Sequence, residues 1–558
     1  MKNFKIIILA LSLVSLVSCN EILNKDPLDS FTNENFWTSE KNVKGYAFAF
    51  YNDFSGYGNA GGLGDFYFPT LSDDQIGRDF TNFTPIQIPA SDTYWRDRWT
   101  TIRRANVLLE NVNRVPMTEA AIAHWEAFGK LMRAWTYYKL VRNYGDVPWV
   151  ETVLDITDEG VLYGKRENRD AIMDKVLDDL KSIDGLYDNT TNEINRAIGN
   201  AMKSEICLYE GTFRKYRTSP DAAGAEKFLR ESKAASEYVM SKGYTLHSNY
   251  RELYNSINLR GNSEMIFYKE YLSGILLHST IAYITASTQI SGLSKNAFEA
   301  YLFNDGRPLA LTSHDTSDEA IIVSAPVAAD PDRKIMNIKH LLDVRDKRLS
   351  QTIDTALCYV SRDFLATTSS SGYRVIKFDN LSLPATERTT TSNNHTDAPL
   401  FWLSVIYLNY AEACAELGSI TQADLDNTIN KLKARAGLPP LSLNVGFNDP
   451  ANNMNVSNLI WEIRRERRCE LMMDNNFRYW DLIRWHQLDK LDSKVYPDIM
   501  LGANIKEDTE NTDIQREGNY IDGSKGLQRI FDNKYYLTPI PSGQITLNPQ
   551  LEPNNPGW

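Results

Sequence analysis

Apolar residues recur every three or four positions along much of the first half of the chain. Between residues 118 and 144 the spacing is 3, 4 and 3 for the large side chains Trp125, Phe128, Met132 and Trp135. Such spacing places these side chains on one face of an α-helix. Pro116 before the segment and Gly145 after it are typical helix boundary signals. The pattern therefore predicts a long helix with one wide apolar face.

The same periodicity predicts a mainly helical chain. It recurs over residues 197–216, and weaker versions cover 38–54, 93–112, 168–187, 225–242, 400–417, 422–435, 455–474 and 477–488. These segments come in pairs with short connections. A helix pair that cannot bury its apolar face alone stacks on its neighbours, as tetratricopeptide-like units do. We therefore expect an all-α scaffold.

Residues 250–398 have a different texture, rich in Gly, Ser and Thr and interrupted by prolines. Short strand-like runs occur at 265–268 and 373–377, and the tracts 367–371 and 389–394 read as mobile loop tips. Phe298, Tyr301 and Phe303 are expected to fill the core of this region. Long irregular excursions on a rigid scaffold often carry binding residues. We therefore expect a variable ligand-binding lobe over residues 251–398.

The N-terminus carries an export signal. Lys2 and Lys5 precede an apolar stretch of about 12 residues, which is too short for a membrane span of about 20. Small and apolar residues then lead to Cys19. This pattern predicts a lipoprotein signal peptide over 1–18, lipidation of Cys19 and a tether over 19–30, since two or three acyl chains anchor stably. The alternative is an ordinary signal peptide with a chance cysteine.

Charge and cysteine content exclude several classes of protein. The chain has 60 Lys and Arg against 72 Asp and Glu. A chain this acidic is a poor candidate for binding nucleic acid, or an anionic membrane through a basic patch. The cysteines after Cys19 are far apart, without metal-site or redox spacing. We expect them to be small buried residues, and we expect neither a metal site nor a cofactor. No nucleophile-elbow or phosphate-loop motif occurs.

Ordered motifs along the chain resemble one family. They include Tyr144-Gly145-Asp146-Val147-Pro148, the run Tyr407-Leu408-Asn409-Tyr410-Ala411-Glu412-Ala413, and Arg435-Ala436-Gly437-Leu438. Later come Glu466-Arg467-Arg468-Cys469-Glu470-Leu471, the segment from Phe477 to Trp485, and the closing Asn555-Pro556-Gly557-Trp558. In these motifs the chain resembles the SusD/RagB outer-membrane nutrient-binding lipoproteins of Bacteroidetes-type bacteria.

The resemblance implies a SusD-like fold, with four tetratricopeptide-like helix pairs and an irregular, loop-rich variable lobe. It divides the chain into an N-terminal helical part (31–250), the lobe (251–398) and a C-terminal part (399–558). It also implies a protein without enzymatic activity, lipid-anchored at the outer membrane and facing the cell surface. Such a protein captures oligosaccharides, or peptides in some members, for a SusC-like TonB-dependent porin.

Candidate ligand contacts come from residues outside the shared motifs. Sugars need flat apolar surfaces and hydrogen-bonding groups. Segment 65–99 supplies both types of group, in Asp73, Asp74, Arg78, Tyr94 and Trp95. The lobe adds Tyr271, Tyr283 and Arg374. From the sequence we expect Trp95→Ala or Asp73→Ala to weaken binding without a large loss of stability, whereas Trp99 reads as a core residue.

Two charged runs favour structural roles. Arg467 and Glu470 lie three positions apart in a predicted helix, so the run 464–470 is expected to form ion pairs along the helix and with Asp481 or Arg484. The acidic cluster 507–511 lacks the ligand spacing of a calcium loop and is expected to be a solvated loop.

Glycan binding without catalysis is the first hypothesis for function. Binding of peptides or another nutrient is a second. A lipid-anchored glycoside hydrolase is a third, since two carboxylates about 5–10 Å apart suffice for hydrolysis. A structural adhesin, which would bind no small ligand, is a fourth.

Overall fold

The computed structural model describes residues 36–285, 290–362 and 367–558. The predicted signal peptide (1–18), the predicted lipidation site Cys19 and the predicted tether (19–30) lie outside the described residues.

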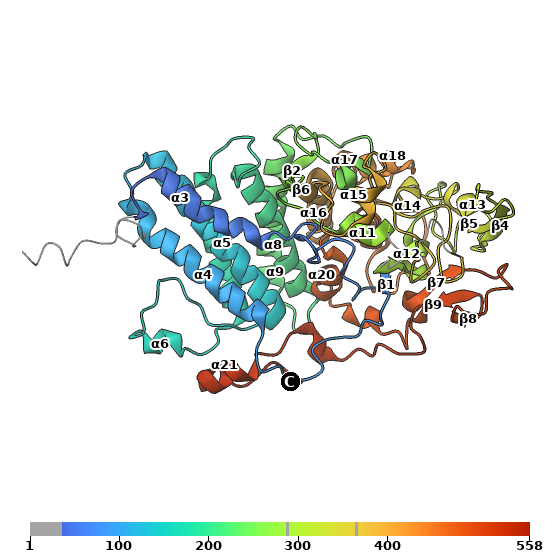
Figure 1. The fold of residues 1–558 in the computed structure, drawn as a ribbon. Helices are drawn as coiled ribbons and strands as arrows, with labels where there is room; N and C mark the ends of the chain where they lie inside the picture. Colours follow the sequence, from blue (N-terminus) through green and yellow to red (C-terminus); the bar gives the residue numbers. More distant parts are fainter. Residues whose placement is uncertain (1–35, 286–289, 363–366) are drawn as a thin grey trace, which may run out of the picture.

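Long helices form one half of the molecule (Figure 1). They are α3 (Glu40–Ala47), α4 (Thr93–Asn111), α5 (Glu119–Tyr144), α7 (Arg169–Leu180), α8 (Arg196–Tyr216) and α9 (Ala222–Met240). Helix α4 packs on α5, α5 on α7, and α8 on α9. Polar N-caps start several of these helices: Thr118 accepts a hydrogen bond at the start of α5, and Asn195 does so at the start of α8. The helices predicted for this half are therefore confirmed.

The C-terminal helices continue this layer. Helix α16 (Leu403–Glu416) packs against α9 and against α19 (Asn458–Glu470), and α20 (Phe477–Arg484) packs against α8. The predicted helix 422–435 is two helices, α17 (Gln422–Asn427) and α18 (Ile429–Ala436), because Thr428 between them leaves helical geometry at φ −130° and ψ −89°. The first residues of the predicted helix 400–417 instead belong to strand β6 (Ala398–Trp402). The fold is all-α and SusD-like, as predicted.

Short strands and helices make up the lobe beside these helices (Figure 1). Four small antiparallel sheets occur in the described residues: β1 (Gln75–Gly77) with β3 (Ser291–Leu293), β2 (Met265–Lys269) with β6, β4 (Ile321–Ser324) with β5 (Lys334–Asn337), and β9 (Tyr520–Asp522) between β7 (Leu501–Asn504) and β8 (Arg516–Glu517). The strand predicted over 265–268 is confirmed. The strand-like run 373–377 is not a strand, because only Val375 forms an isolated bridge, to Ile353.

The remaining helices are short. In the first half and the lobe they are α6 (Glu159–Leu162), α10 (Glu252–Asn255), α11 (Thr280–Thr285), α12 (Lys295–Ala300), α13 (Lys339–Leu342), α14 (Lys347–Thr352) and α15 (Ala385–Thr389). Helix α21 (Ser542–Leu547) lies near the C-terminus. The 3-10 helices are η1 (Phe48–Asp53), η2 (Val112–Arg114), η3 (Lys181–Gly185), η4 (Leu488–Leu491), η5 (Pro497–Met500), η6 (Asn533–Tyr536) and η7 (Pro549–Leu551).

Two large apolar clusters fill the interior. One lies among the long helices and the other under the lobe. Phe298, Tyr301 and Phe303 are at most 1% exposed, which confirms their predicted place in the core. Four described cysteines are buried, as predicted: Cys207, Cys358, Cys414 and Cys469.

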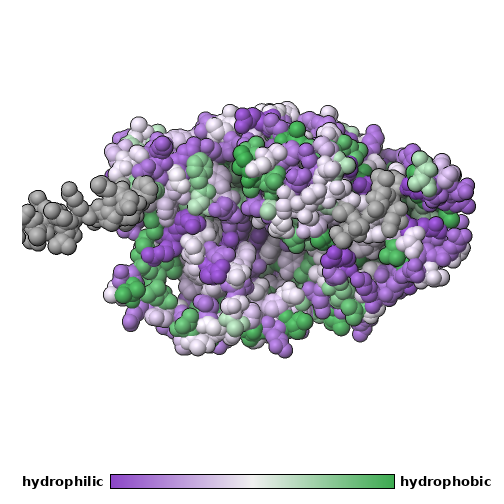
Figure 2. Space-filling model, viewed as in Figure 1, coloured by the Kyte–Doolittle hydropathy of each residue, from purple (hydrophilic) through white to green (hydrophobic). Residues whose placement is uncertain are grey.

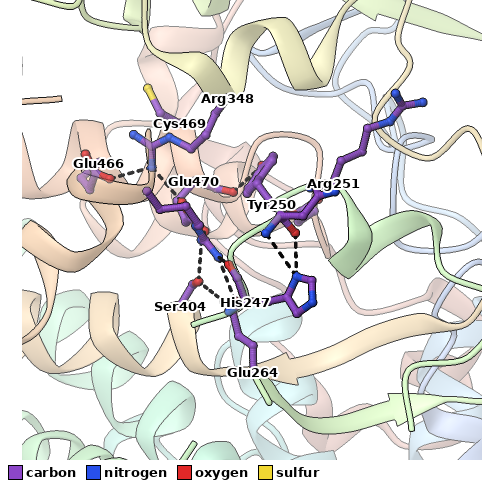
Figure 3. Close-up of polar contacts among 12 residues, drawn as sticks. His247, Tyr250, Arg251, Glu264, Arg348, Ser404, Glu466, Cys469 and Glu470 are labelled. Carbon is purple, nitrogen blue, oxygen red and sulfur yellow. Dashed lines mark hydrogen bonds and ion pairs between the residues drawn. The ribbon is translucent and has the colours of Figure 1, made fainter. Parts of the chain in front are cut away.

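A buried network of ion pairs joins the lobe to the helices (Figure 3). Arg348 of α14 contacts Asp346 at 2.6 Å, Glu466 at 2.6 Å and Glu470 at 2.7 Å. Arg435 bridges Glu470 to Glu264. Ion pairing of this charged run is confirmed, although Glu470 of α19 pairs with arginines of other elements rather than with Arg467.

One expectation for an exposed loop is wrong, and two hold only in part. In tract 367–371, Thr367, Ser369 and Ser371 are at most 6% exposed, because their hydroxyls and backbone are bound to neighbouring segments. In tract 389–394, residues 389–392 are exposed, but Asn394 is fully buried and its backbone pairs with His278. In the acidic cluster, Glu507 and Glu510 are exposed, but Asp508 is buried against Arg362 at 2.7 Å.

Hydrophilic and hydrophobic residues are mixed over the face seen in Figure 2, which is hollowed near its middle. Within the described part of the chain, no helix combines the length and apolarity needed to cross a membrane.

Candidate functional site

Asp73 and Asp74, predicted as ligand contacts, are bound to arginines of the C-terminal helices. Arg478 of α20 donates two hydrogen bonds to Asp73, at 2.8 and 2.7 Å. Arg468 of α19 donates to Asp74 at 2.6 Å. Both carboxylates are at most 4% exposed. Burial alone would raise the pKa of Asp73, but the charges of Arg468 and Arg478 hold that pKa well below its usual range.

Asp74 has the opposite shift, because burial and the neighbouring charge of Asp73 together outweigh Arg468 and raise its pKa. Both carboxylates are bound to arginine, and Asp73 also lines a cavity of about 240 Å³ together with Arg468 and Arg478. Their role in the structure is to fix the loop before β1 onto the helical layer.

The same loop is joined to the lobe through backbone pairing. Strand β1 pairs with β3, and the backbone N–H of Arg78 donates to the carbonyl of Ile290 at 2.7 Å. The hydroxyl of Tyr67 accepts hydrogen bonds from the backbone of Ile290 and Ser291. Two segments more than 200 residues apart thus form one unit, which Asp73 and Asp74 bind to arginines of α19 and α20.

Polar side chains remain accessible where this unit reaches the surface. The side chain of Arg78 is 54% exposed, and its ionic contact is with Asp79, which is 82% exposed. Lys525 is also exposed, and its ammonium group donates to the carbonyl of Arg78 at 2.7 Å. A guanidinium, a carboxylate and an ammonium group therefore lie together at the end of β1.

Tyr283 is an aromatic residue that packs against the loop leading into β1. It lies on α11, is half-buried, and makes an edge-to-face contact with Phe68, with 5.5 Å between ring centroids. Phe68 belongs to the loop that leads into β1. We call the set Arg78, Asp79, Tyr283 and Lys525 the β1–β3 rim. It combines an apolar ring with charged hydrogen-bonding groups, the chemistry that sugar recognition uses.

Trp95 and Tyr94 lie at the start of α4, away from this rim. Trp95 is 4% exposed and packs edge-on against Tyr144 at 4.9 Å and against Trp99 at 5.5 Å. The structure therefore places Trp95 in the core, whereas Trp99, predicted as a core residue, is half-buried. Tyr94 is half-buried, and its hydroxyl accepts a hydrogen bond from Asn143 at 3.3 Å.

Two further predicted contacts are buried. Tyr271 is 2% exposed, and its hydroxyl donates to the carbonyl of Gly58 at 2.6 Å. Arg374 is 7% exposed and pairs with Asp354 at 2.7 Å. The Tyr271 hydroxyl and the terminal nitrogens of Arg374 are thus bound within the protein, whereas Nε of Arg374 is buried without a hydrogen-bond partner among the described residues. Of the eight predicted ligand contacts, the structure brings only Arg78 and Tyr283 to the rim.

Sequence reasoning missed Asp79 and Lys525. Asp79 follows Arg78 directly in the sequence, and this adjacent charge in a loop could have indicated Asp79 as a candidate ligand contact. Lys525 lies 447 positions from Arg78, and no sequence pattern connects the two. In the described residues, no cluster of three or more His, Cys, Asp and Glu side chains could hold a metal ion.

Two family models match the chain. One, described as the SusD family, matches residues 287–558. The other, described as starch-binding associating with outer membrane, matches residues 86–223. The chain belongs to the SusD/RagB family. The SusD-like protein P2 of Formosa agariphila is 22% identical over 587 residues, covering all of both chains.

Solved structures share the fold. A SusD-like carbohydrate-binding protein from Bacteroides fragilis superposes with a TM-score of 0.69 at 20% identity, over 93% of this chain and all of that one. A laminarin-binding SusD-like protein gives a TM-score of 0.55 at 20% identity, over 94% of this chain and all of that one. The resemblance predicted from the sequence motifs is confirmed.

Proposed function

We propose that this SusD/RagB protein binds an oligosaccharide or polysaccharide at the β1–β3 rim without changing it. The observation that carries the proposal is the exposed Arg78 at the end of β1. Asp73 and Asp74 bind this segment to the C-terminal helices, and Tyr283 packs against Phe68 of the loop that leads into β1. A rigid support lowers the entropy that a binding site loses when it captures a ligand. Support comes also from the family, which includes a laminarin-binding SusD-like protein.

The protein further acts, in this proposal, as a lipid-anchored receptor at the outer membrane. Cys19 would carry the lipid and hold the folded part at the cell surface. The bound glycan would pass to a SusC-like TonB-dependent porin for uptake. The outer-membrane association in the description of the matching family model supports this location.

The paired carboxylates of segment 65–99 argue against hydrolysis. Glycoside hydrolysis needs one carboxylic acid that donates a proton and one carboxylate that acts as base or nucleophile. Asp73 is held as a carboxylate by two arginines, and Asp74 is bound to Arg468. Asp79 is the remaining carboxylate of the rim. We therefore propose a binding protein rather than an enzyme.

Isothermal titration of the protein starting at Asn20 tests this proposal. The titrants are plant, fungal, bacterial and host polysaccharides, with peptides included. We expect saturable, micromolar or weaker binding of one glycan class, about −8 kcal/mol or less favourable, and no cleavage products by chromatography. Heat from peptides alone would favour the peptide alternative, and cleavage of the bound glycan would favour the hydrolase.

Variants of the rim locate the site. Arg78→Ala and Tyr283→Ala should each weaken glycan binding at least fivefold, because each removes a contact of about 1 kcal/mol or more. Matched controls are Arg230→Ala on the surface of α9, where the side chain is 68% exposed, and Tyr163→Ala, where the residue is 47% exposed. Unchanged binding in both rim variants, with binding intact in the parent, would place the glycan elsewhere.

A further inference from the structure

A cavity lies among the helices, apart from the β1–β3 rim. It has a volume of about 420 Å³ and is lined by residues of η1, α4, α5, α8, β6 and α20. Ligand pockets in proteins range from about 300 to 1,000 Å³. The cavity is therefore large enough for a small molecule.

Aromatic side chains form much of its wall. Phe54 and Trp135 stack at 6.0 Å between ring centroids, and Phe401 lies beside Trp135 at 6.1 Å. Trp480 of α20 also lines the cavity, with the Arg142 guanidinium 4.0 Å from its ring centroid. Flat apolar walls of this kind suit the C–H faces of a sugar ring.

Three buried N–H donors lining the cavity lack an acceptor. They are the indole Nε1 of Trp135 and the guanidinium Nε atoms of Arg98 and Arg142, and none of them finds a hydrogen-bond partner among the described residues. Trp135 is only 5% exposed. An unpaired buried donor costs about 1–3 kcal/mol. Each of these three atoms has less than 1 Å² of accessible surface, so a ligand in the cavity can accept their hydrogen bonds only after the side chains turn toward it.

Acceptors for hydroxyl groups are present as well. Glu205 of α8 lines the cavity. Asp65 lines it too. Hydroxyl groups are unusual in offering both a donor and an acceptor. A ligand with several hydroxyls could therefore satisfy the N–H groups and the carboxylates together.

Acidic and basic side chains share the wall of the cavity. Arg98, Lys139 and Arg142 are the basic ones, and Asp53, Asp65 and Glu205 are the acidic ones. Asp53 is already paired with Arg98 and with Lys139, at 2.8 Å for the latter. Burial raises the pKa of Asp65 and of Glu205, and a hydroxyl group can donate to the ionised form of a carboxyl or accept from its protonated form.

We propose that this cavity is a second binding site, for a neutral sugar of one or two rings. An adjoining cavity of about 490 Å³ shares Asn52, Phe54 and Leu400 with it. The adjoining cavity adds Asn59, Asn192 and Tyr268 to the lining. These shared residues lie between the two cavities, and a two-ring sugar would reach the second cavity past them. This site stands apart from the proposed function, because none of the rim residues lines either cavity.

Titration with small sugars tests the site. The probes are D-glucose, D-galactose, D-mannose and cellobiose, added at millimolar concentration to the protein starting at Asn20. We expect at least one of them to bind, and we expect Trp135→Phe to weaken that binding about five- to tenfold. This substitution keeps an aromatic ring and removes the N–H donor, which corresponds to the loss of about one hydrogen bond.

Trp402→Phe is the matched control. Trp402 is fully buried and its Nε1 also lacks a partner among the described residues, but Trp402 does not line this cavity. Its substitution should leave sugar binding unchanged, as should Arg78→Ala at the rim. An equal loss in Trp402→Phe would overturn the proposal, since the effect would then come from the core.

Crystals of the unaltered protein soaked in the sugar that binds give a second measurement, which does not depend on the folding of a variant. Sugar density against Trp135 and Glu205 would support the site. Water alone in the cavity, or no binding of any of the four sugars, would overturn it.

Discussion

Arg478 binds Asp73 through two parallel hydrogen bonds, although the two residues lie 405 positions apart in the chain. The pair fastens the loop before β1 to helix α20. Asp73 has two acceptor oxygens that match the planar guanidinium fork, and such bidentate pairs are geometrically specific. Asp73, which the sequence suggested as a ligand contact, therefore fixes the loop next to the proposed binding surface.

Asp73→Ala should destabilise the fold. The substitution leaves Arg478 and Arg468 buried without their shared counter-charge, and breaking a buried pair in this way costs about 3–5 kcal/mol. Urea unfolding measures the change in the free energy of unfolding. Asp79→Ala is the control, because Asp79 is 82% exposed and should change stability by about 0.5 kcal/mol or less. If the Asp73→Ala protein kept its stability but bound glycan more weakly, Asp73 would be a ligand contact after all.

Glu470→Ala should be more destabilising than the loss of a surface ion pair. Glu470 is fully buried between Arg348 and Arg435, so its removal leaves two buried cations partly uncompensated, at a cost of about 3–5 kcal/mol. Lys339→Ala removes an exposed pair with Asp343, where we expect about 0–1 kcal/mol. Thermal unfolding gives the melting temperature of each variant for comparison with the parent protein. Similar melting temperatures would show that the network in Figure 3 contributes little.

Asp397 should make stability depend on pH between about 4 and 6. Burial raises the pKa of Asp397 to about 6 from its ordinary 3.8, despite hydrogen bonds from the backbone of Leu259 and Tyr271. The folded protein therefore binds a proton in this range that the unfolded chain does not bind. This contribution to stability is complete below pH 3.8 and is lost as the pH rises through about 6.

The measurement is the free energy of unfolding of the parent and of Asp397→Asn at pH 4.5, 5.5 and 7. We expect the difference between the two proteins to change with pH across this range, because the amide of the variant does not titrate. A constant difference would show that Asp397 has the same pKa in both states.

Trp95→Ala should lower stability and leave the rim intact. Trp95 is buried against Tyr144 and Trp99, and truncation of a buried Trp costs about 3–5 kcal/mol. Ile156→Ala is the control, because Ile156 is 87% exposed. Chemical unfolding gives the stability, and titration with the identified glycan gives the affinity of the folded variant. Loss of affinity without loss of stability would contradict the core assignment.

Much of the helical layer was predictable because its signal is local. The spacing of Trp125, Phe128 and Met132 requires only that a helix bury one face, and α5 covers Glu119–Tyr144 as expected. The interruption at Thr428 was not predictable, since an apolar face continues across it. Residues 373–377 have the composition of a strand, but strands need a partner, and only Val375 finds one.

The candidate site was less predictable than the fold. Composition drew attention to segment 65–99 and to the lobe, and both contribute to the rim. Which side chains are free, however, depends on partners far along the chain. Asp74 accepts a hydrogen bond from Arg468, which lies 394 positions away in the chain. The Tyr271 hydroxyl donates to the carbonyl of Gly58, 213 positions away.

The sequence by itself determined the positions of most long helices and the membership of the family, because periodicity and ordered motifs are properties of neighbouring residues. The tertiary structure alone decided which polar and aromatic side chains remain available. Asp73 and Arg78 lie five positions apart, on either side of β1, and only packing distinguishes them. Arginines of α19 and α20 cover Asp73, whereas Arg78 faces solvent. Burial requires a polar group to find a partner within the protein, and that partner is fixed by the fold.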